Sequence, residues 1–125
     1  MQKSPLSSRI LWTRHALEKM KFYRLSQARV KRVLYHPDRV EEGIALNTIA
    51  SMQKAGSQKH PYEIWAMYQK ISSRSSSPKI NLNLPKLRVI SAWRYPGESP
   101  EGKRITIPED VQQDLISLGI LKNYA

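Results

Sequence analysis

The chain contains no cysteine and no long apolar run, and both absences narrow what it can be. Without cysteine, a disulfide framework and thiolate metal sites are excluded. No stretch approaches the roughly 18 apolar residues that a membrane helix needs. Residues 1–9 are polar and no apolar segment follows them, unlike a secretory signal. We therefore expect a cytoplasmic protein with no membrane contact.

Signals for bound metals and cofactors are equally sparse. The histidines, His15, His36 and His60, are dispersed and show no HxxxH spacing. The last two precede prolines, so turn geometry explains them better than metal ligation. A glycine-rich phosphate loop, a nucleophile elbow and paired catalytic carboxylates are missing from the sequence. We therefore expect neither a metal nor a cofactor.

Positive charge dominates the sequence and is segregated along it. The net charge is +11 over 125 residues. Residues 1–37 hold nine lysines or arginines against one acid, Glu18, and residues 64–97 hold six with no acid. Residues 38–63 and 98–125 are each slightly negative. A concentrated positive field attracts polyanions, so this segregation favours nucleic acid as a partner over charge that only maintains solubility.

The length and the 40% hydrophobic content suit one core and little more. We expect residues 1–125 to form a single domain, with residues 1–8 as a flexible tail. A serine-rich, basic stretch over residues 72–86 predicts a long hairpin loop. Residues 105–121 are expected to form a C-terminal helical extension.

The N-terminal part has the pattern of a helical hairpin. A short strand is expected at residues 9–13, and Thr13 can then cap a helix over residues 14–24, where apolar residues recur at helical spacing. Ser26 can cap a second helix. Because Pro37 cannot continue a helix and disfavours helical geometry in the residue before it, the second helix should end just ahead of it.

The pattern then changes to strands and one last helix. Four runs rich in β-branched and aromatic residues should pair in sequence as an antiparallel meander: residues 40–45, 48–54, 62–71 and 87–95. Near the C-terminus, Pro108 stands where a helix can begin and Gly119 just past its end. The sequence therefore predicts an α+β domain, in which a helical hairpin packs on an antiparallel sheet of about four strands and a C-terminal helix follows.

Four segments of the sequence resemble those of a known group of proteins. They are HALEKM at residues 15–20, the helix that Ser26 caps, PDRVEEG at residues 37–43 and LRVISAWR at residues 87–94. Over roughly residues 10–96 the chain resembles a small bacterial family of domains of unknown function, which is similar in fold to the RelE and BrnT toxins of toxin–antitoxin systems. The resemblance implies a sheet wrapped by helices.

For the toxin relatives, the resemblance implies metal-free cleavage of mRNA, often on the ribosome, whereas many family members have no demonstrated activity. The chain departs from the family at three positions: arginine is usual where it has Lys19 and Tyr23, and glycine where it has Arg24. A glycine there suits a left-handed helix end. The arginine therefore leaves open whether the turn between the helices is the same in this chain.

RNA cleavage without a metal uses the 2′-hydroxyl as nucleophile and needs a base, an acid and cations around the phosphate. His15 is the candidate acid or base because its ordinary pKa lies near neutrality, and Lys19 lies one turn later on the same helix face. The alternative is that His15 only orders the start of the helix by a hydrogen bond to a nearby carbonyl. Arg94 is the preferred phosphate-binding cation, with Tyr95 as second choice.

The last strand limits how these groups can combine. Arg88 and Arg94 fall on one face of it but roughly 20 Å apart, too far to hold one phosphate together. Tyr95 points to the face opposite Arg94 unless a bulge intervenes. Trp93 and Tyr68 could stack on bases, as in proteins that bind single strands, although a core position explains the tryptophan better.

The sequence leaves three functions open. The first is a RelE/BrnT-like protein that binds RNA or the ribosome and cleaves mRNA without a metal. The second is a noncatalytic module of the same fold that holds RNA phosphates. The third is docking of an acidic partner such as an antitoxin on the basic face, with the C-terminal helix or a second copy covering that face. The cations expected to contact RNA are Arg14, Lys21, Arg24, Arg29, Arg32, Arg74 and Arg88.

Overall fold

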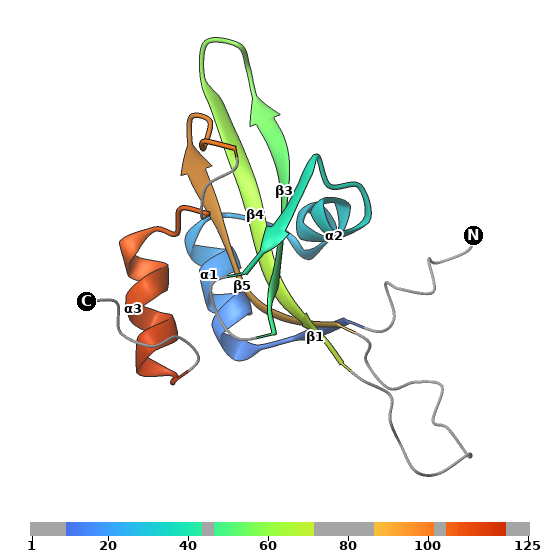
Figure 1. Cartoon of the computed structure of the whole chain (residues 1–125), viewed down its shortest axis with the longest axis vertical. Helices are drawn as coiled ribbons and strands as arrows, with labels where there is room; N and C mark the ends of the chain where they lie inside the picture. Colours follow the sequence, from blue (N-terminus) through green and yellow to red (C-terminus); the bar gives the residue numbers. More distant parts are fainter. Residues whose placement is uncertain (1–9, 44–46, 72–86, 102–104, 120–125) are drawn as a thin grey trace.

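The computed structural model describes residues 10–43, 47–71, 87–101 and 105–119. These parts form an α+β fold in which two N-terminal helices and a C-terminal helix pack on one sheet (Figure 1). The elements are β1 (Ile10–Trp12), α1 (Arg14–Phe22), α2 (Gln27–Tyr35), β2 (Arg39–Glu42), β3 (Ile49–Gly56), β4 (Pro61–Lys70), β5 (Leu87–Pro96) and α3 (Glu109–Ser117). None of the helices in these ranges is long and apolar enough to span a bilayer.

Several predicted features lie outside the described residues. They are the tail at residues 1–8, residues 44–45 of the strand expected at 40–45, the loop at residues 72–86 with Arg74, and residues 120–121 of the C-terminal extension. Of that extension, only Glu109–Ser117 is helical among the described residues. Pro108, predicted at the first helical position, is instead the N-cap, so the helix begins one residue later, at Glu109. Gly119, at φ +74°, follows the C-cap, as predicted.

The helical hairpin is confirmed, and both predicted caps are made. Thr13 Oγ1 accepts a hydrogen bond from the N–H of Ala16, and Ser26 Oγ accepts one from the N–H of Arg29. The second helix ends at Tyr35, two residues before Pro37, as predicted.

The turn between the helices is left-handed even though it lacks glycine. Arg24 adopts φ +58°, and the N–H of Leu25 donates to the carbonyl of Met20 across 2.7 Å. The N–H of Arg24 donates to the carbonyl of Lys21, which completes a Schellman motif. Leu25 and Met20 are both buried, so this apolar contact helps to hold the arginine in a conformation that glycine adopts more easily.

The sheet is mixed and has five strands in the order β1-β5-β4-β3-β2, rather than about four antiparallel strands. The predicted meander of β2 to β5 is present. The correction is β1, which pairs parallel with the outer edge of β5 and places Ile10 opposite Leu87. Thr13 extends this contact, because its N–H and its hydroxyl both donate to the carbonyl of Val89.

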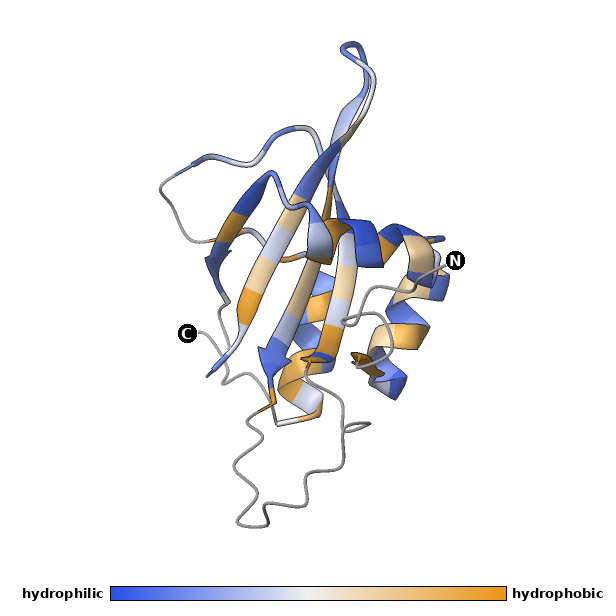
Figure 2. Ribbon diagram, turned by 90° about the vertical axis from the view of Figure 1, so that its right-hand side faces the viewer, coloured by the Kyte–Doolittle hydropathy of each residue, from blue (hydrophilic) through white to orange (hydrophobic). Residues whose placement is uncertain are grey.

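Each face of the sheet carries its own hydrophobic core. On the α3 face, sheet side chains pack against the C-terminal segment, and the buried members include Met52, Trp65, Trp93, Val111 and Leu115. On the α2 face they pack against the hairpin, and the buried members include Met20, Val30, Val33, Ile64 and Ala92. Figure 2 shows the hydrophobic residues toward the middle of the central strands. Helices on both sides of the sheet therefore contribute to folding.

The tryptophans of the central strands are core residues. Trp65 and Trp93 are both 0% exposed, and their rings stack with centroids 6.2 Å apart. The core interpretation is thus confirmed, and the idea that Trp93 stacks on bases is wrong because no base can reach it. Tyr68, the other aromatic considered for stacking, is partly buried.

A β-bulge in β5 overturns one prediction about its arginines. Met67 pairs with Ser91 but the next residue, Tyr68, pairs with Val89, so β5 carries an extra residue at Ile90. The alternation of side chains shifts there. Arg88, paired with Gln69, therefore lies on the α3 face, whereas Arg94, paired with Ile64, lies on the α2 face. Arg88 and Arg94 are on opposite faces, not on one. The bulge precedes Arg94, so Tyr95 still points away from it, toward the α3 face.

Candidate functional site

The residues predicted for catalysis lie around α1 and its contacts with α3 and β5. His15 and Lys19 lie on α1 and face α3, whereas Arg94 contacts the C-terminal end of α1. Arg94 Nε donates to the carbonyl of Tyr23, and the helix between His15 and Tyr23 spans about 12 Å. Tyr95 packs in the core of the α3 face. The structure thus brings His15 and Lys19 together beside α3, and it places Arg94 about 12 Å from His15 along the helix.

Lys19 is bracketed by two carboxylates of α3. Its Nζ lies 2.7 Å from Asp110 Oδ2 and 2.7 Å from Asp114 Oδ2. Tyr23 of α1 also contacts α3, because its hydroxyl donates to Asp110 Oδ1 across 2.8 Å. We call these contacts of Lys19 and Tyr23 with Asp110 and Asp114 the junction between α1 and α3. The acidic C-terminal helix therefore covers this part of the basic N-terminal helix.

These contacts shift the pKa values of the junction in opposite directions. Burial would lower the pKa of Lys19, but its hydrogen bonds to Asp110 and Asp114 outweigh that and raise the pKa. Burial would raise the pKa of Asp110, but hydrogen bonds from Lys19 and Tyr23 lower it overall. Burial, followed by the hydrogen bond to Asp110, raises the pKa of Tyr23. Asp110 and Lys19 are therefore both charged at neutral pH.

His15 is buried beside this junction, with 9% of its surface exposed. Its Nδ1 lies 4.0 Å from Asp114 Oδ2, and its Nε2 has no hydrogen-bond partner among the described residues. Burial lowers its pKa more than the charge of Asp114 raises it. A neutral, covered imidazole next to an already paired lysine is a poor acid–base pair for RNA cleavage. Among the described residues, His15 Nε2 also does not make the hydrogen bond to a carbonyl that the alternative interpretation expected.

A group of arginines gathers where the turn between α1 and α2 meets the sheet. We call Arg24, Arg29, Arg32 and Arg94 the arginine cluster. Arg94 links it together, because its Nε donates to the carbonyl of Tyr23 and its Nη2 to the carbonyl of Arg24, at 2.7 and 3.2 Å. The guanidinium of Arg94 also lies over the ring of Tyr62, 5.0 Å from the centroid.

The charges of this cluster influence one another. Burial lowers the pKa of Arg29, and the nearby charges of Arg32 and Arg94 lower it further, while Tyr62 acts in the opposite direction. Arg29 is held in place by a hydrogen bond from Nη1 to Gln53 Oε1, at 2.6 Å. Arg32 and Arg94 therefore both lie close enough to Arg29 for their positive charge to act on it.

The described residues place no acid in contact with the cluster. Ion pairs in the described ranges involve only His15, Lys19 and Arg39 among the basic residues. The first turn of α2, which carries Arg29, also contains no acidic residue. The positive end of the α2 dipole therefore adds to the arginine charges. This surface attracts anions, and the described part of the chain supplies no acidic group paired with it.

The remaining predicted RNA-binding cations are more scattered. Arg14 and Lys21 are exposed on α1, and Arg88 donates to Gln69 Oε1 on the α3 face. Arg74 lies outside the described residues. Sequence reasoning missed Tyr62, because a tyrosine near the start of a strand gives no sign that an arginine 32 positions later will lie over its ring.

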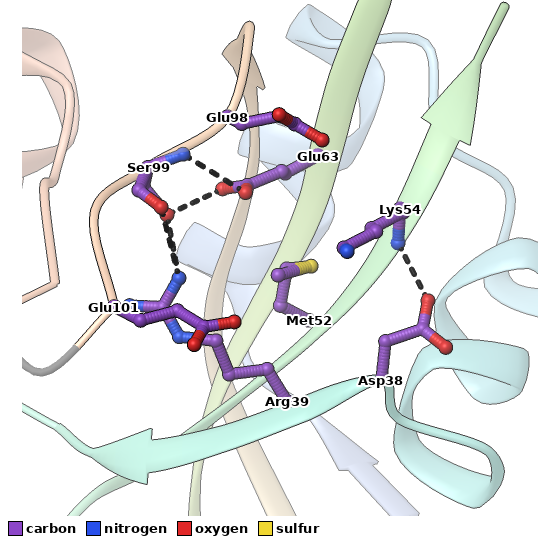
Figure 3. A pocket seen from close by; sticks show the side chains of 8 residues that line it. All are labelled: Asp38, Arg39, Met52, Lys54, Glu63, Glu98, Ser99 and Glu101. Atoms are coloured by element: carbon purple, nitrogen blue, oxygen red, sulfur yellow. Dashed lines mark hydrogen bonds between the residues drawn. The ribbon is translucent and has the colours of Figure 1, made fainter. Parts of the chain in front are cut away.

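A hollow lies elsewhere, between β2, β3, β4 and the segment after β5 (Figure 3). It has a volume of about 410 Å³ and is lined by Asp38, Arg39, Met52, Lys54, Glu63, Glu98, Ser99 and Glu101. Acids outnumber cations in this lining, so the hollow does not suit a phosphate. No group of three or more potential metal ligands occurs in the described ranges.

The buried groups of this hollow hold the chain together. Glu63, 1% exposed, accepts hydrogen bonds from Trp65 Nε1 and from the hydroxyl and N–H of Ser99. Arg39 donates to Glu41 and Ser99 and to the carbonyl of Pro100. Figure 3 shows Glu63 and Ser99 facing each other across the hollow's upper rim. Because each of these polar groups already has a protein partner, we interpret the hollow as a clamp on residues 98–101.

Comparisons with known proteins do not restrict the function. No family model matches the chain, and neither a curated protein nor a solved structure matches it. The functional argument therefore depends on the side chains and their geometry.

Proposed function

We propose that this protein is an RNA-binding protein of RelE/BrnT-like fold that contacts phosphates through the arginine cluster. The observation that carries the proposal is that Arg94 lies over Tyr62 and that Arg94 and Arg32 both act on Arg29 with their positive charge, with no ion pair to these arginines among the described residues. Guanidinium groups present several N–H donors in a plane and bind phosphate oxygens in pairs, so such a cluster suits a phosphate backbone.

The mutual repulsion within the cluster supports this proposal. Like charges that lie close together destabilise the folded protein unless a counter-charge joins them. Arg29 is held there by Gln53, and Arg94 by two backbone carbonyls, so the repulsion is built into the fold. A polyanion would relieve it and release its own condensed counterions at the same time.

Binding has better support than cleavage. Cleavage of mRNA requires an acid and a base that reach the scissile phosphate, but His15 is buried and Lys19 is bracketed by Asp110 and Asp114. Cleavage through these two residues stays a prediction. It is tested by incubating mRNA with the protein, with and without ribosomes, and mapping the products by primer extension. Products that disappear with His15→Ala, while RNA affinity stays within a few fold, would establish it.

The salt dependence of RNA affinity tests the binding proposal. A labelled single-stranded RNA of mixed sequence is titrated with protein at several KCl concentrations, and the dissociation constant is read from fluorescence anisotropy. Each phosphate contact contributes a log–log slope of about −0.7 on a single strand. We expect Arg29→Ala and Arg32→Ala each to weaken binding and to make the slope shallower by about 0.7.

Lys70→Ala is the matched control. Lys70 is exposed at the far end of β4 from Tyr62, about 26 Å along the strand. The control removes one positive charge without touching the cluster, so the slope should stay as in the unaltered protein. Equal losses for Lys70→Ala and Arg29→Ala would mean that net charge, not the cluster, holds RNA. Polyglutamate that displaces RNA at equal charge concentration would favour an acidic protein partner instead.

A further inference from the structure

Phe22 is the most exposed large hydrophobic residue of the described chain, at 68%. A single exposed apolar side chain is common and needs no explanation by itself. This ring differs because its surroundings fix it. It meets the ring of Tyr23 edge to face, with centroids 4.9 Å apart and planes at 84°, and Lys19 Nζ lies 5.2 Å from its centroid.

Both neighbours of the ring are themselves held by α3. Lys19 and Tyr23 bind the two oxygens of the same carboxylate, that of Asp110, at 2.7 and 2.8 Å. Two contacts with ordered groups thus determine where the Phe22 ring lies, while most of its surface faces solvent. An aromatic ring that is both exposed and held in place can accept a planar ligand with little loss of side-chain entropy.

Phe22 is also close to the arginine cluster along the chain. It directly precedes Tyr23, whose carbonyl accepts the hydrogen bond from Arg94, and stands two residues before Arg24. Lys21, also exposed, is its other chain neighbour. Proteins that bind single-stranded nucleic acid combine these two features, a positive surface that follows the phosphates and an aromatic ring on which a base stacks.

We propose that Phe22 is a stacking platform for an unpaired base of an RNA whose phosphates lie on the arginine cluster. The inference deepens the proposed RNA binding and rests on it. It commits the ligand to single-stranded RNA, because a base inside a duplex has both faces covered by its neighbours and cannot stack on a protein ring. The base approaches the part of the ring that Lys19 leaves open.

The test compares Phe22→Ala with Leu118→Ala, which removes another exposed apolar side chain, 55% exposed, from the end of α3. Affinity is measured for a 12-nucleotide single-stranded RNA of mixed sequence and for the same sequence as a duplex. Loss of one stacked base should weaken single-strand binding roughly five- to 150-fold for Phe22→Ala. The salt slope should not change, because no phosphate contact is lost. Leu118→Ala should bind as the unaltered protein does, and Phe22→Tyr should retain the affinity.

A spectroscopic measurement gives an independent readout. Phe22→Trp places an indole at this position, and stacking of a base should quench its fluorescence when the single-stranded RNA is added. The native Trp65 and Trp93 are fully buried and Trp12 is partly buried, so the unaltered protein supplies the background signal. Quenching by the single strand and none by the duplex is the expected result.

The outcomes separate the two proposals. If neither RNA binds the unaltered protein, the proposed function fails and the platform fails with it. If single-stranded RNA binds in a salt-dependent manner but Phe22→Ala binds equally well, only the platform is overturned. The platform is also overturned if Phe22→Ala weakens duplex and single strand alike. Dissociation of a dimer by Phe22→Ala in sedimentation equilibrium would assign the ring to a protein contact instead.

Discussion

Single arginines in this protein serve the fold and the proposed function at the same time. Arg94 closes the C-terminal end of α1 by donating to the carbonyls of Tyr23 and Arg24, which have no partner within the helix. The same contacts hold its guanidinium over Tyr62, beside Arg29. A side chain that is already ordered by the fold loses little entropy when it binds a phosphate.

Arg24 is the residue at which stability and RNA binding oppose each other most directly. Its φ of +58° strains a residue with a Cβ, so Arg24→Gly should relieve strain and raise the free energy of unfolding by about 0.5–1 kcal/mol. The same change removes a cation and should weaken RNA binding, with a salt slope shallower by about 0.7. Urea denaturation and fluorescence anisotropy measure the two effects.

Asn47→Gly is the matched control for this prediction. Asn47 has φ +61°, but asparagine tolerates that conformation better than arginine, so its gain in stability should be smaller and RNA affinity should not change. A loss of stability in Arg24→Gly would show that the arginine side chain makes contacts worth more than the strain of its backbone.

At the scale of elements, α3 is part of the core and not a removable cover. Val111 and Leu115 are 0% exposed against the sheet, so moving α3 away would expose the fully buried Trp65 to water. Its carboxylates meanwhile hold Lys19 and Tyr23 of α1. The helix therefore joins the hairpin to the α3 face of the sheet, and this explains why access to His15 is restricted.

The junction between α1 and α3 predicts a loss of stability in two separate pH ranges. The pKa of His15 is lowered from 6.5 by burial, so the unfolded chain binds a proton first, and stability should fall as pH drops below about 6.5. Asp110 has its pKa lowered from 3.8, by hydrogen bonds that outweigh burial. The contribution of Asp110 to stability is fully present above pH 3.8, its ordinary pKa, and is lost as the pH falls through its lower pKa in the folded state.

Urea denaturation between pH 8 and pH 3 measures this dependence. His15→Asn should flatten the curve between pH 7 and pH 5 without changing the steep part at acid pH, and Asp110→Asn should do the reverse. Parallel curves for His15→Asn and the unaltered protein above pH 5 would show that His15 has the same pKa in the folded and unfolded chain.

For the whole molecule, the net charge of +11 opposes compaction by self-repulsion. Salt should therefore raise the melting temperature of the free protein. RNA should stabilise it further, by about 2.7 kcal/mol when the free RNA concentration is 100 times the dissociation constant. Salt should reduce this second gain, since it weakens binding. Thermal denaturation with and without RNA, at low and high KCl, gives both effects.

The variant that carries both Arg29→Ala and Arg32→Ala separates the two contributions. It should keep the stabilisation by salt, because most of the net charge remains, and lose most of the stabilisation by RNA. If both variant and unaltered protein gain equally from RNA, the arginine cluster is not where RNA binds.

Local signals determined much of the fold. The caps Thr13 and Ser26, the stop before Pro37 and the ends marked by Pro108 and Gly119 depend on residues a few positions apart, and each was predictable from the sequence. The antiparallel meander followed from strands that are neighbours along the chain. The surplus of positive charge follows from the amino-acid composition alone.

Only the tertiary structure decided the arrangement of the candidate site. The pairing of β1 with β5 includes a hydrogen bond between Thr13 and Val89 across 76 positions, and Lys19 meets Asp110 across 91. The bulge at Ile90, which separates the faces of the β5 arginines, leaves no local mark in the sequence. Contacts between distant residues depend on how whole elements pack, and no periodicity or capping pattern within one segment records that packing.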